Sequence, residues 1–124
     1  MIKFNLKGNL FAVFNCTSKE IKIYDVGNDI LSLASKIEKD ENFFSLKVNK
    51  DVDDLYQYFK EVRTLKFDLE DRFIYLNNNK EVIVINIKSK EHKIHPIDLQ
   101  KYDGIAGMKM KSSDEENYQL FVVT

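Results

Sequence analysis

A second cysteine is absent from this 124-residue chain, so Cys16 cannot form an intramolecular disulfide. The amino terminus also lacks the long apolar run that a secretory signal or a membrane span requires. Both absences predict a protein of a reducing compartment, the cytoplasm or the nucleus, that is neither secreted nor held by a transmembrane segment. We interpret Cys16 as a buried or half-buried structural thiol, because no histidine lies near it in the sequence to activate it.

Arginine is scarce, with Arg63 and Arg72 as the only guanidinium groups. Bidentate recognition of phosphate depends on such groups, so the sequence offers little for it. Nineteen basic residues and twenty acidic residues leave a formal net charge of −1. Because this charge balance does not attract polyanions, we expect no nucleic-acid partner.

Proline occurs once, while aromatic residues make up 12% and hydrophobic residues 44% of the chain. This composition excludes an intrinsically disordered protein, since enough apolar surface is available to offset the entropy of folding. The length is sufficient for a self-contained core. We therefore expect residues 1–124 to form one folded domain or domain fragment.

Most of the chain shows the alternation of apolar residues that is typical of β-strands. In the first half, this pattern predicts strands at 2–6 and 20–26 and an extended segment at 43–48, and a short apolar run predicts a buried strand at 10–14. Residues 30–37 fit both a helix and a strand, and we favour a strand because three strands precede it. One amphipathic helix is predicted from Asp51 to Val62, with Asp51 as its N-cap.

An internal repeat organises these strands. The segment Ile2-Lys-Phe-Asn-Leu6 recurs 63 residues later as Leu65-Lys-Phe-Asp-Leu69, and Lys19-Glu-Ile recurs 61 residues later as Lys80-Glu-Val. A partial third copy takes in Met108 to Asp114 and Tyr118 to Val123. The outer strand of the second copy, Lys93 to Ile97, can hold Pro96 because an edge strand has free amides. The repeat predicts blade-like units at 1–48 and 63–100, a helical insertion at 49–62 and a partial unit at 101–124.

A four-stranded repeat of this length is the period of propeller blades. The segment from Phe4 to Val13 resembles the first two strands of a WD-repeat β-propeller blade. Ile21 to Val26 resembles the third strand, with Tyr24-Asp25 where Trp-Asp is usual. The chain departs from the family pattern in having no tryptophan and no Gly-His pair, and Ile85-Asn86 replaces the signature in the second unit. The resemblance implies a mainly antiparallel all-β fold, an incomplete propeller of about two and a half blades with one helix near 51–62.

A weaker resemblance links residues 62–110 to the second blade of the phosphoinositide-binding autophagy propellers, with Gly104-Ile105 at the entry to a third blade. The paired-arginine motif that carries lipid binding in that family is not in this sequence. The resemblance therefore implies a membrane lipid as a partner without assigning it to any residue.

Three architectures remain open, because two and a half blades do not close a ring. The chain is the amino-terminal piece of a longer propeller, or another chain completes the ring, or the fold is an α+β single sheet crossed by the 51–62 helix. The last arrangement needs no missing partner.

His92 and His95, with Glu91 and Asp98 nearby, offer the nitrogen and oxygen atoms of a metal site. Residues three apart on a strand point to opposite faces, so we predict no metal site there. No other pattern indicates a catalytic residue, a cofactor site or a defined interaction residue.

We therefore predict a protein without enzymatic activity that acts as a protein–protein interaction scaffold in a larger assembly, with other proteins as partners, among them a chain that completes the propeller. Two alternatives stay open. One is a small α+β ligand-binding domain or enzyme that uses Tyr56, Tyr58 or the histidines in a pocket between helix and sheet. The other is a phosphoinositide-binding propeller at membranes.

Overall fold

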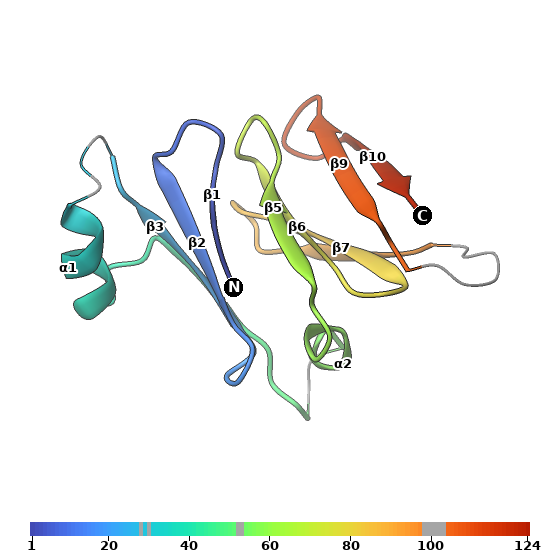
Figure 1. The fold of residues 1–124 in the computed structure, drawn as a ribbon, viewed down its shortest axis with the longest axis horizontal. Coiled ribbons are helices and arrows are strands. Elements are labelled where there is room, and N and C mark those ends of the chain that lie inside the picture. Colours follow the sequence, from blue (N-terminus) through green and yellow to red (C-terminus); the bar gives the residue numbers. More distant parts are fainter. Residues whose placement is uncertain (28, 30, 52–53, 98–103) are drawn as a thin grey trace. The chain divides into compact units, whose positions relative to one another are not determined.

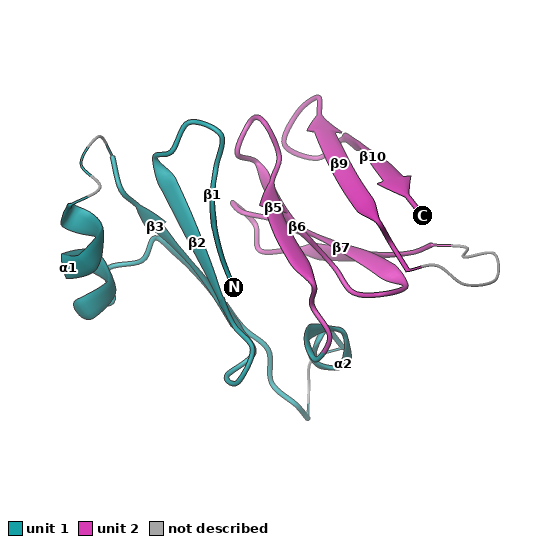
Figure 2. Cartoon of the chain, in the orientation of Figure 1, with its two compact units in different colours: residues 1–60 teal, residues 61–124 magenta. Residues whose placement is uncertain are grey.

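The structure is a computed structural model that describes residues 1–27, 29, 31–51, 54–97 and 104–124. Within these residues the strands form three antiparallel sheets, two with four strands and one with two (Figure 1). The chain divides into two compact units, residues 1–60 and 61–124 (Figure 2). The finer division into 1–48, 49–62, 63–100 and 101–124 stays a prediction.

The first sheet has the strand order β1 (Ile2–Phe4), β2 (Leu10–Asn15), β3 (Glu20–Asp25) and β4 (Phe44–Lys47). The apolar residues of its two central strands are mostly buried, and each strand ends in an exposed residue, Asn15 or Asp25. The fully buried side chains on these strands include Ala12, Ile21 and Ile23. This sheet carries the first copy of the repeat.

The segment for which we favoured a strand is a helix, α1 (Ser32–Glu38), so that prediction is wrong for the described residues; Ile30 lies outside them. The place of the fourth strand is taken by β4, which pairs with β3 from Ile23↔Phe44 to Glu20↔Lys47. Leu33 of α1 packs against a buried cluster of Phe11, Tyr24 and Val26. The apolar periodicity of this segment fits both a helix and a strand. The packing of Leu33 on this cluster explains why the segment is a helix.

The second helix, α2 (Tyr56–Phe59), confirms a helix near 51–62 but is shorter than the predicted span. It starts after Leu55, so Asp51 is not its N-cap; the Asp51 amide instead donates to Asn49 Oδ1 at 3.0 Å in a turn. Val52 and Asp53 lie outside the described residues. Phe59 is fully buried, and its ring meets that of Phe14 on β2 edge-on at 5.3 Å. The helix therefore belongs to the first unit.

The second sheet has the order β5 (Thr64–Phe67), β6 (Phe73–Asn77), β7 (Glu81–Asn86) and β8 (His92–Pro96). All five residues of β6 and the four from Val82 to Ile85 on β7 are buried. Pro96 lies on β8 at the edge of this sheet, opposite Glu81, which confirms the prediction of an outer strand. The two central strands thus form the buried core of this sheet.

The third sheet is a hairpin of β9 (Gly107–Ser112) and β10 (Tyr118–Val123), two strands that lie within residues 101–124, the segment assigned to the partial third copy. One face of the hairpin packs on the second sheet in a cluster with Phe73, Tyr75, Val82 and Val84. The hairpin contributes Met108, Met110, Tyr118, Leu120 and Val122 to this cluster. Because the sheets are separate ladders in the described residues, the alternative of one α+β sheet crossed by a helix is wrong.

The repeat extends to hydrogen bonds in the turn between the first two strands of each sheet. Asn5 and Asp68 are both buried, and each accepts a hydrogen bond from the first residue of the following strand, Leu10 at 3.0 Å and Phe73 at 2.8 Å. The backbone bonds Asn5 N–H to Leu10 O and Asp68 N–H to Phe73 O are both 3.1 Å long. The two copies therefore share a turn as well as a strand pattern.

Candidate interaction surfaces

A groove of about 330 Å³ lies in the second unit, between the β7–β8 hairpin and the β9–β10 hairpin. Its apolar wall is formed by side chains of β6, β7 and β10, and its polar wall by the residues around the start of β8 and the β9–β10 turn. The lining residues are Phe73, Val84, Asn86, Glu91, His92, Lys93, Glu116 and Tyr118. Such a mixture of an apolar base and polar groups is typical of recognition sites.

Two ties hold the walls of this groove together. The Asn86 side-chain amide donates to the Glu115 carbonyl oxygen at 2.6 Å, and Lys88 Nζ lies 3.2 Å from Glu115 Oε2. The Asn86 side chain also accepts from the amides of Lys88 and Ser89, which fixes the turn after β7. The groove is therefore formed in the folded chain before any partner arrives.

His92 and His95 lie on β8 opposite Ile85 and Val82, residues three apart on β7. They consequently belong to opposite faces of the second sheet, which matches the reason for predicting no metal site. In the part of the chain that the structure describes, no group of three or more His, Cys, Asp or Glu side chains could hold a metal ion. Asp98, the remaining candidate, lies outside the described residues.

His95 joins the second sheet to the third. Its Nε2 atom is 2.5 Å from the Tyr118 hydroxyl, and the two rings meet edge-on with centroids 5.7 Å apart. Burial lowers the pKa of His95, and the charge of Lys93 lowers it further. Burial also raises the pKa of the Tyr118 hydroxyl. His95 and Tyr118 are therefore both uncharged at neutral pH, and a hydrogen bond joins the imidazole to the phenol at the side of the groove.

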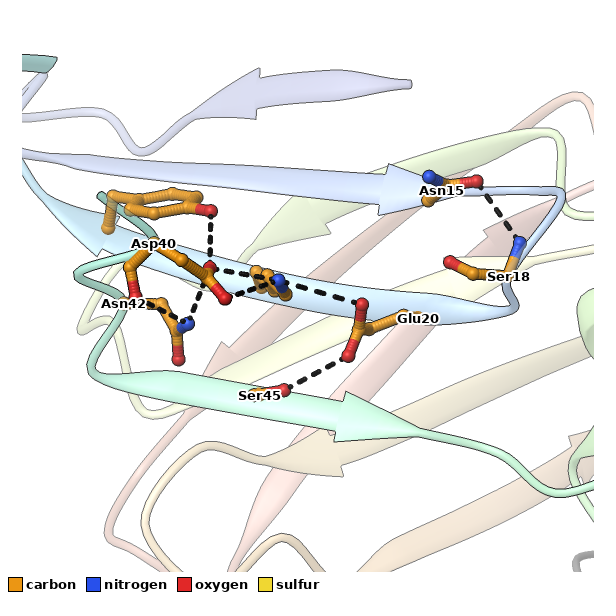
Figure 3. A network of polar contacts seen from close by, with 8 residues as sticks. Asn15, Ser18, Glu20, Asp40, Asn42 and Ser45 are labelled. Carbon is orange, nitrogen blue, oxygen red and sulfur yellow. Dashed lines mark hydrogen bonds and ion pairs between the residues drawn. The ribbon is translucent and has the colours of Figure 1, made fainter. Parts of the chain in front are cut away.

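A second hollow, of about 390 Å³, lies against the first sheet beside a network of polar contacts (Figure 3). Lys22 Nζ lies 2.8 Å from Asp40 Oδ1 and 3.7 Å from Glu20 Oε1. The hydrogen bond from Lys22 is the main cause that lowers the pKa of Asp40, and the same bond raises the pKa of Lys22. The Tyr24 hydroxyl also donates to Asp40, at 3.2 Å. This network holds the turn after α1 on the sheet.

The face of the β9–β10 hairpin that does not pack on the second sheet is exposed. It carries alternating residues of both strands: Lys109 and Lys111 on β9, and Gln119, Phe121 and Val123 on β10. The exposed fractions of Phe121 and Val123 are 54% and 63%. Among the described residues β10 pairs with β9 alone, so one strand edge is also free. Exposed apolar side chains beside an open edge are features of a binding surface.

Three other residues considered from the sequence lie elsewhere. Cys16 is exposed in the turn between β2 and β3, so the prediction of a buried or half-buried thiol is wrong. The reason is its position in a tight hairpin turn, which none of the described segments covers. Tyr56 lines a shallow hollow with Lys50, Asp54 and Gln57, all from its own segment, and does not form a pocket against a sheet there. Tyr58 is half-buried on the same helix.

The groove and the exposed hairpin face were not identified from the sequence, although two of the groove residues, Glu91 and His92, were considered there as metal ligands. Alternation within Tyr118 to Val123 separates Tyr118, Leu120 and Val122 from Gln119, Phe121 and Val123, which signals two different faces. Which face is covered depends on packing against the second sheet, and alternation alone does not contain that information.

No protein-family profile and no curated protein matches this sequence. Among solved structures, the chain is similar to the crystal structure of the WD40 domain of SCAP from fission yeast, with a TM-score of 0.54 and 13% sequence identity. The match covers 99% of this chain and 25% of the solved chain, so the sequence spans about a quarter of that structure's length. At this identity the likeness shows the fold. The chain has the fold of part of a WD40 β-propeller, which confirms the resemblance found in the sequence.

No helix in the described residues is long and apolar enough to cross a membrane.

Proposed function

We propose that this chain is a non-catalytic protein-interaction module that binds an extended segment of a partner polypeptide in the groove between β8 and the β9–β10 hairpin. One observation carries the proposal: a preformed groove with aromatic residues at its base and charged residues at its rim, on a propeller-blade fold. The single cysteine fits work in a reducing compartment, the cytoplasm or the nucleus.

The chemistry of the groove supports a polypeptide partner. Phe73, Val84 and Tyr118 offer apolar contact, and the Phe73 and Tyr118 rings meet at 5.1 Å in a tilted, edge-like arrangement that fixes both. Glu91, Glu116 and Lys93 supply charges of both signs at the rim. Partner side chains of either sign therefore find an opposite charge while an apolar side chain fills the base.

The same lining supports a role without catalysis. Among its described residues there is no serine, threonine or cysteine to serve as a nucleophile. His95, which lies beside the groove, uses its Nε2 atom in a hydrogen bond with the Tyr118 hydroxyl. The groove is thus equipped to hold a chain, and we assign it that role.

The test is a selection of linear peptides from a random display library on the immobilised chain, followed by affinity measurements. Two charge reversals in the groove, Glu91→Lys and Glu116→Lys, should each raise the dissociation constant of the selected peptides about tenfold. The matched control is Glu38→Lys on α1, an exposed carboxylate far from the groove in sequence, which should leave binding unchanged.

Peptides that bind all three variants equally would show that the groove is not the site. If the library yields no binder and small metabolites raise the melting temperature instead, the chain is a small-molecule binder and the proposed function fails.

A further inference from the structure

The second sheet holds the third hairpin by a defined set of contacts. Lys66 Nζ donates to the Met108 carbonyl oxygen at 3.0 Å. Directly opposite Lys66 on the neighbouring strand is Tyr75, which is hydrogen-bonded to the backbone of Met110. Tyr75 is 4% exposed. A lysine and an aromatic residue, paired across β5 and β6, thus bind the backbone of the inner strand of the next hairpin.

The same pair recurs on the exposed face of that hairpin. Lys109 lies directly opposite Phe121, as Lys66 lies opposite Tyr75. Met108 to Asp114 is also the segment that aligns with Leu65 to Asp71 in the repeat. Here, however, Phe121 is 54% exposed. The third hairpin therefore carries the same lysine–aromatic pair on a face that none of the described residues covers.

The apolar residues of the hairpin that Lys66 and Tyr75 hold in the second unit are also defined. The captured hairpin presents two cross-strand apolar pairs, Met108 with Val122 and Met110 with Leu120. The first hairpin of the chain presents the same arrangement at the corresponding repeat positions, Ile2 with Val13 and Phe4 with Phe11.

The first hairpin is also available for binding. Ile2 is 63% exposed and Phe4 is 36% exposed. The backbone of Met1 pairs with Phe14, and the amide of Asn5 donates to Leu10 O. Because hydrogen-bonded residues alternate along an antiparallel ladder, the carbonyl of Ile2 points away from β2. It is thus oriented to accept from a lysine outside the β1–β2 ladder, as the Met108 carbonyl does from Lys66.

We propose that the Lys109, Phe121 and Val123 face of one copy of this chain binds the β1–β2 hairpin of a second copy. Lys109 donates to the Ile2 carbonyl of the second copy, and Phe121 and Val123 pack on its Ile2 and Phe4 side chains. The two surfaces differ, so the contact is head-to-tail, and it forms a closed ring or an open filament according to the rotation between copies. This assembly goes beyond the proposed function and uses none of the groove residues.

The test uses the full chain with one variant that blocks each surface, Phe121→Lys and Ile2→Lys, and measures mass by light scattering and sedimentation. The wild-type chain should assemble with increasing concentration, and each variant alone should be monomeric. An equimolar mixture should form one-to-one dimers and stop there, because each variant retains the surface that the other lacks. Leu31→Lys, at a side chain that is 85% exposed on the α1 side, is the matched control and should assemble like the wild type.

A milder variant, Lys109→Met, keeps the apolar surface and should weaken assembly about tenfold by removing one charge-assisted hydrogen bond. Circular dichroism of every variant shows that loss of assembly is not loss of folding. A wild-type chain that stays monomeric to about 100 µM would overturn the proposal. So would an Ile2→Lys variant that assembles normally, since copies would then pair symmetrically through β10. Peptide binding by the groove does not depend on either result.

Discussion

At the scale of single residues, the turn carboxylate Asp68 is a buried polar group that joins two elements of the second unit. Its Oδ1 accepts from the amides of Arg72 and Phe73 at 2.7 and 2.8 Å, and its Oδ2 accepts from the Ser112 hydroxyl at 2.5 Å. The side chain is 2% exposed. It therefore fixes the turn before β6 and ties the end of β9 to it.

We predict that Asp68→Ala lowers the free energy of unfolding by about 3 kcal/mol, because buried donors lose a charged acceptor. Asp68→Asn should cost about 1 kcal/mol or less, since Asn5 fills the same place in the first sheet. Urea denaturation measures both. Equal losses for the two variants would show that charge, and not hydrogen bonding, is what the turn requires.

The departures from the usual Trp-Asp signature have a physical explanation at this scale. Asp25 ends β3 and accepts from the Gly27 amide at 2.8 Å, and Asn86 ends β7 and accepts from the Lys88 amide at 2.9 Å. Both side chains accept a hydrogen bond from the amide two residues later, because an amide oxygen can cap such a turn just as a carboxylate oxygen can. The sequence therefore loses the signature in the second blade without losing the turn.

His95 gives the chain a dependence on pH. Burial and the charge of Lys93 lower its pKa in the folded state, so the unfolded chain binds a proton first as the pH falls. The contribution of neutral His95 to the free energy of unfolding is therefore present above the pKa of an unfolded histidine, about 6.5. It is lost as the pH falls from this value toward the lowered pKa of the folded state.

We predict that the melting temperature falls between about pH 6.5 and pH 5, and that His95→Gln, which retains a polar partner for Tyr118, reduces this slope. Differential scanning calorimetry across this range measures it. An unchanged slope in the variant would assign the dependence to other groups.

At the scale of elements, local patterns predict the strands well. β2, β3, β6 and β7 follow alternation or continuous apolar runs, and each of these signals is contained in a few consecutive residues. The edge strand β8 follows from its proline and its place in the repeat. These features could be predicted because nothing distant overrides them.

Other features depend on contacts between distant residues, and the sequence pattern does not contain those. α1 is fixed by Leu33 packing on Phe11, Tyr24 and Val26, and the turn after it by Asp40 binding Lys22. The bond between His95 and Tyr118 joins residues 23 apart, and that between Asn86 and Glu115 joins residues 29 apart. The groove exists only when these hairpins lie together.

Because α1 is short and has no buried residue, it should be less stable than the β2–β3 ladder of the first unit. We predict that Leu33→Ala increases amide hydrogen exchange across residues 32–40, while the β2–β3 ladder keeps its protection. Leu31→Ala is the control, since Leu31 is 85% exposed and should change nothing. Faster exchange throughout the first sheet would instead show that α1 supports the sheet as a whole.

At the scale of the whole molecule, the chain is a set of repeated antiparallel units with the fold of WD40 propeller blades. The two four-stranded sheets share strand order, register and turn hydrogen bonds, and the third hairpin repeats the beginning of the same unit. Within the second unit, the third hairpin covers one apolar face of the second sheet and leaves its own other face exposed.

The most direct test of this account is a measurement of cross-strand nuclear Overhauser effects between backbone protons in solution. We predict three separate ladders, with contacts such as Ile23 to Phe44 in the first sheet, Val84 to Lys93 in the second and Met110 to Leu120 in the third. A single continuous ladder that joins strands of different sheets, or a strand in place of α1 beside β3, would contradict it.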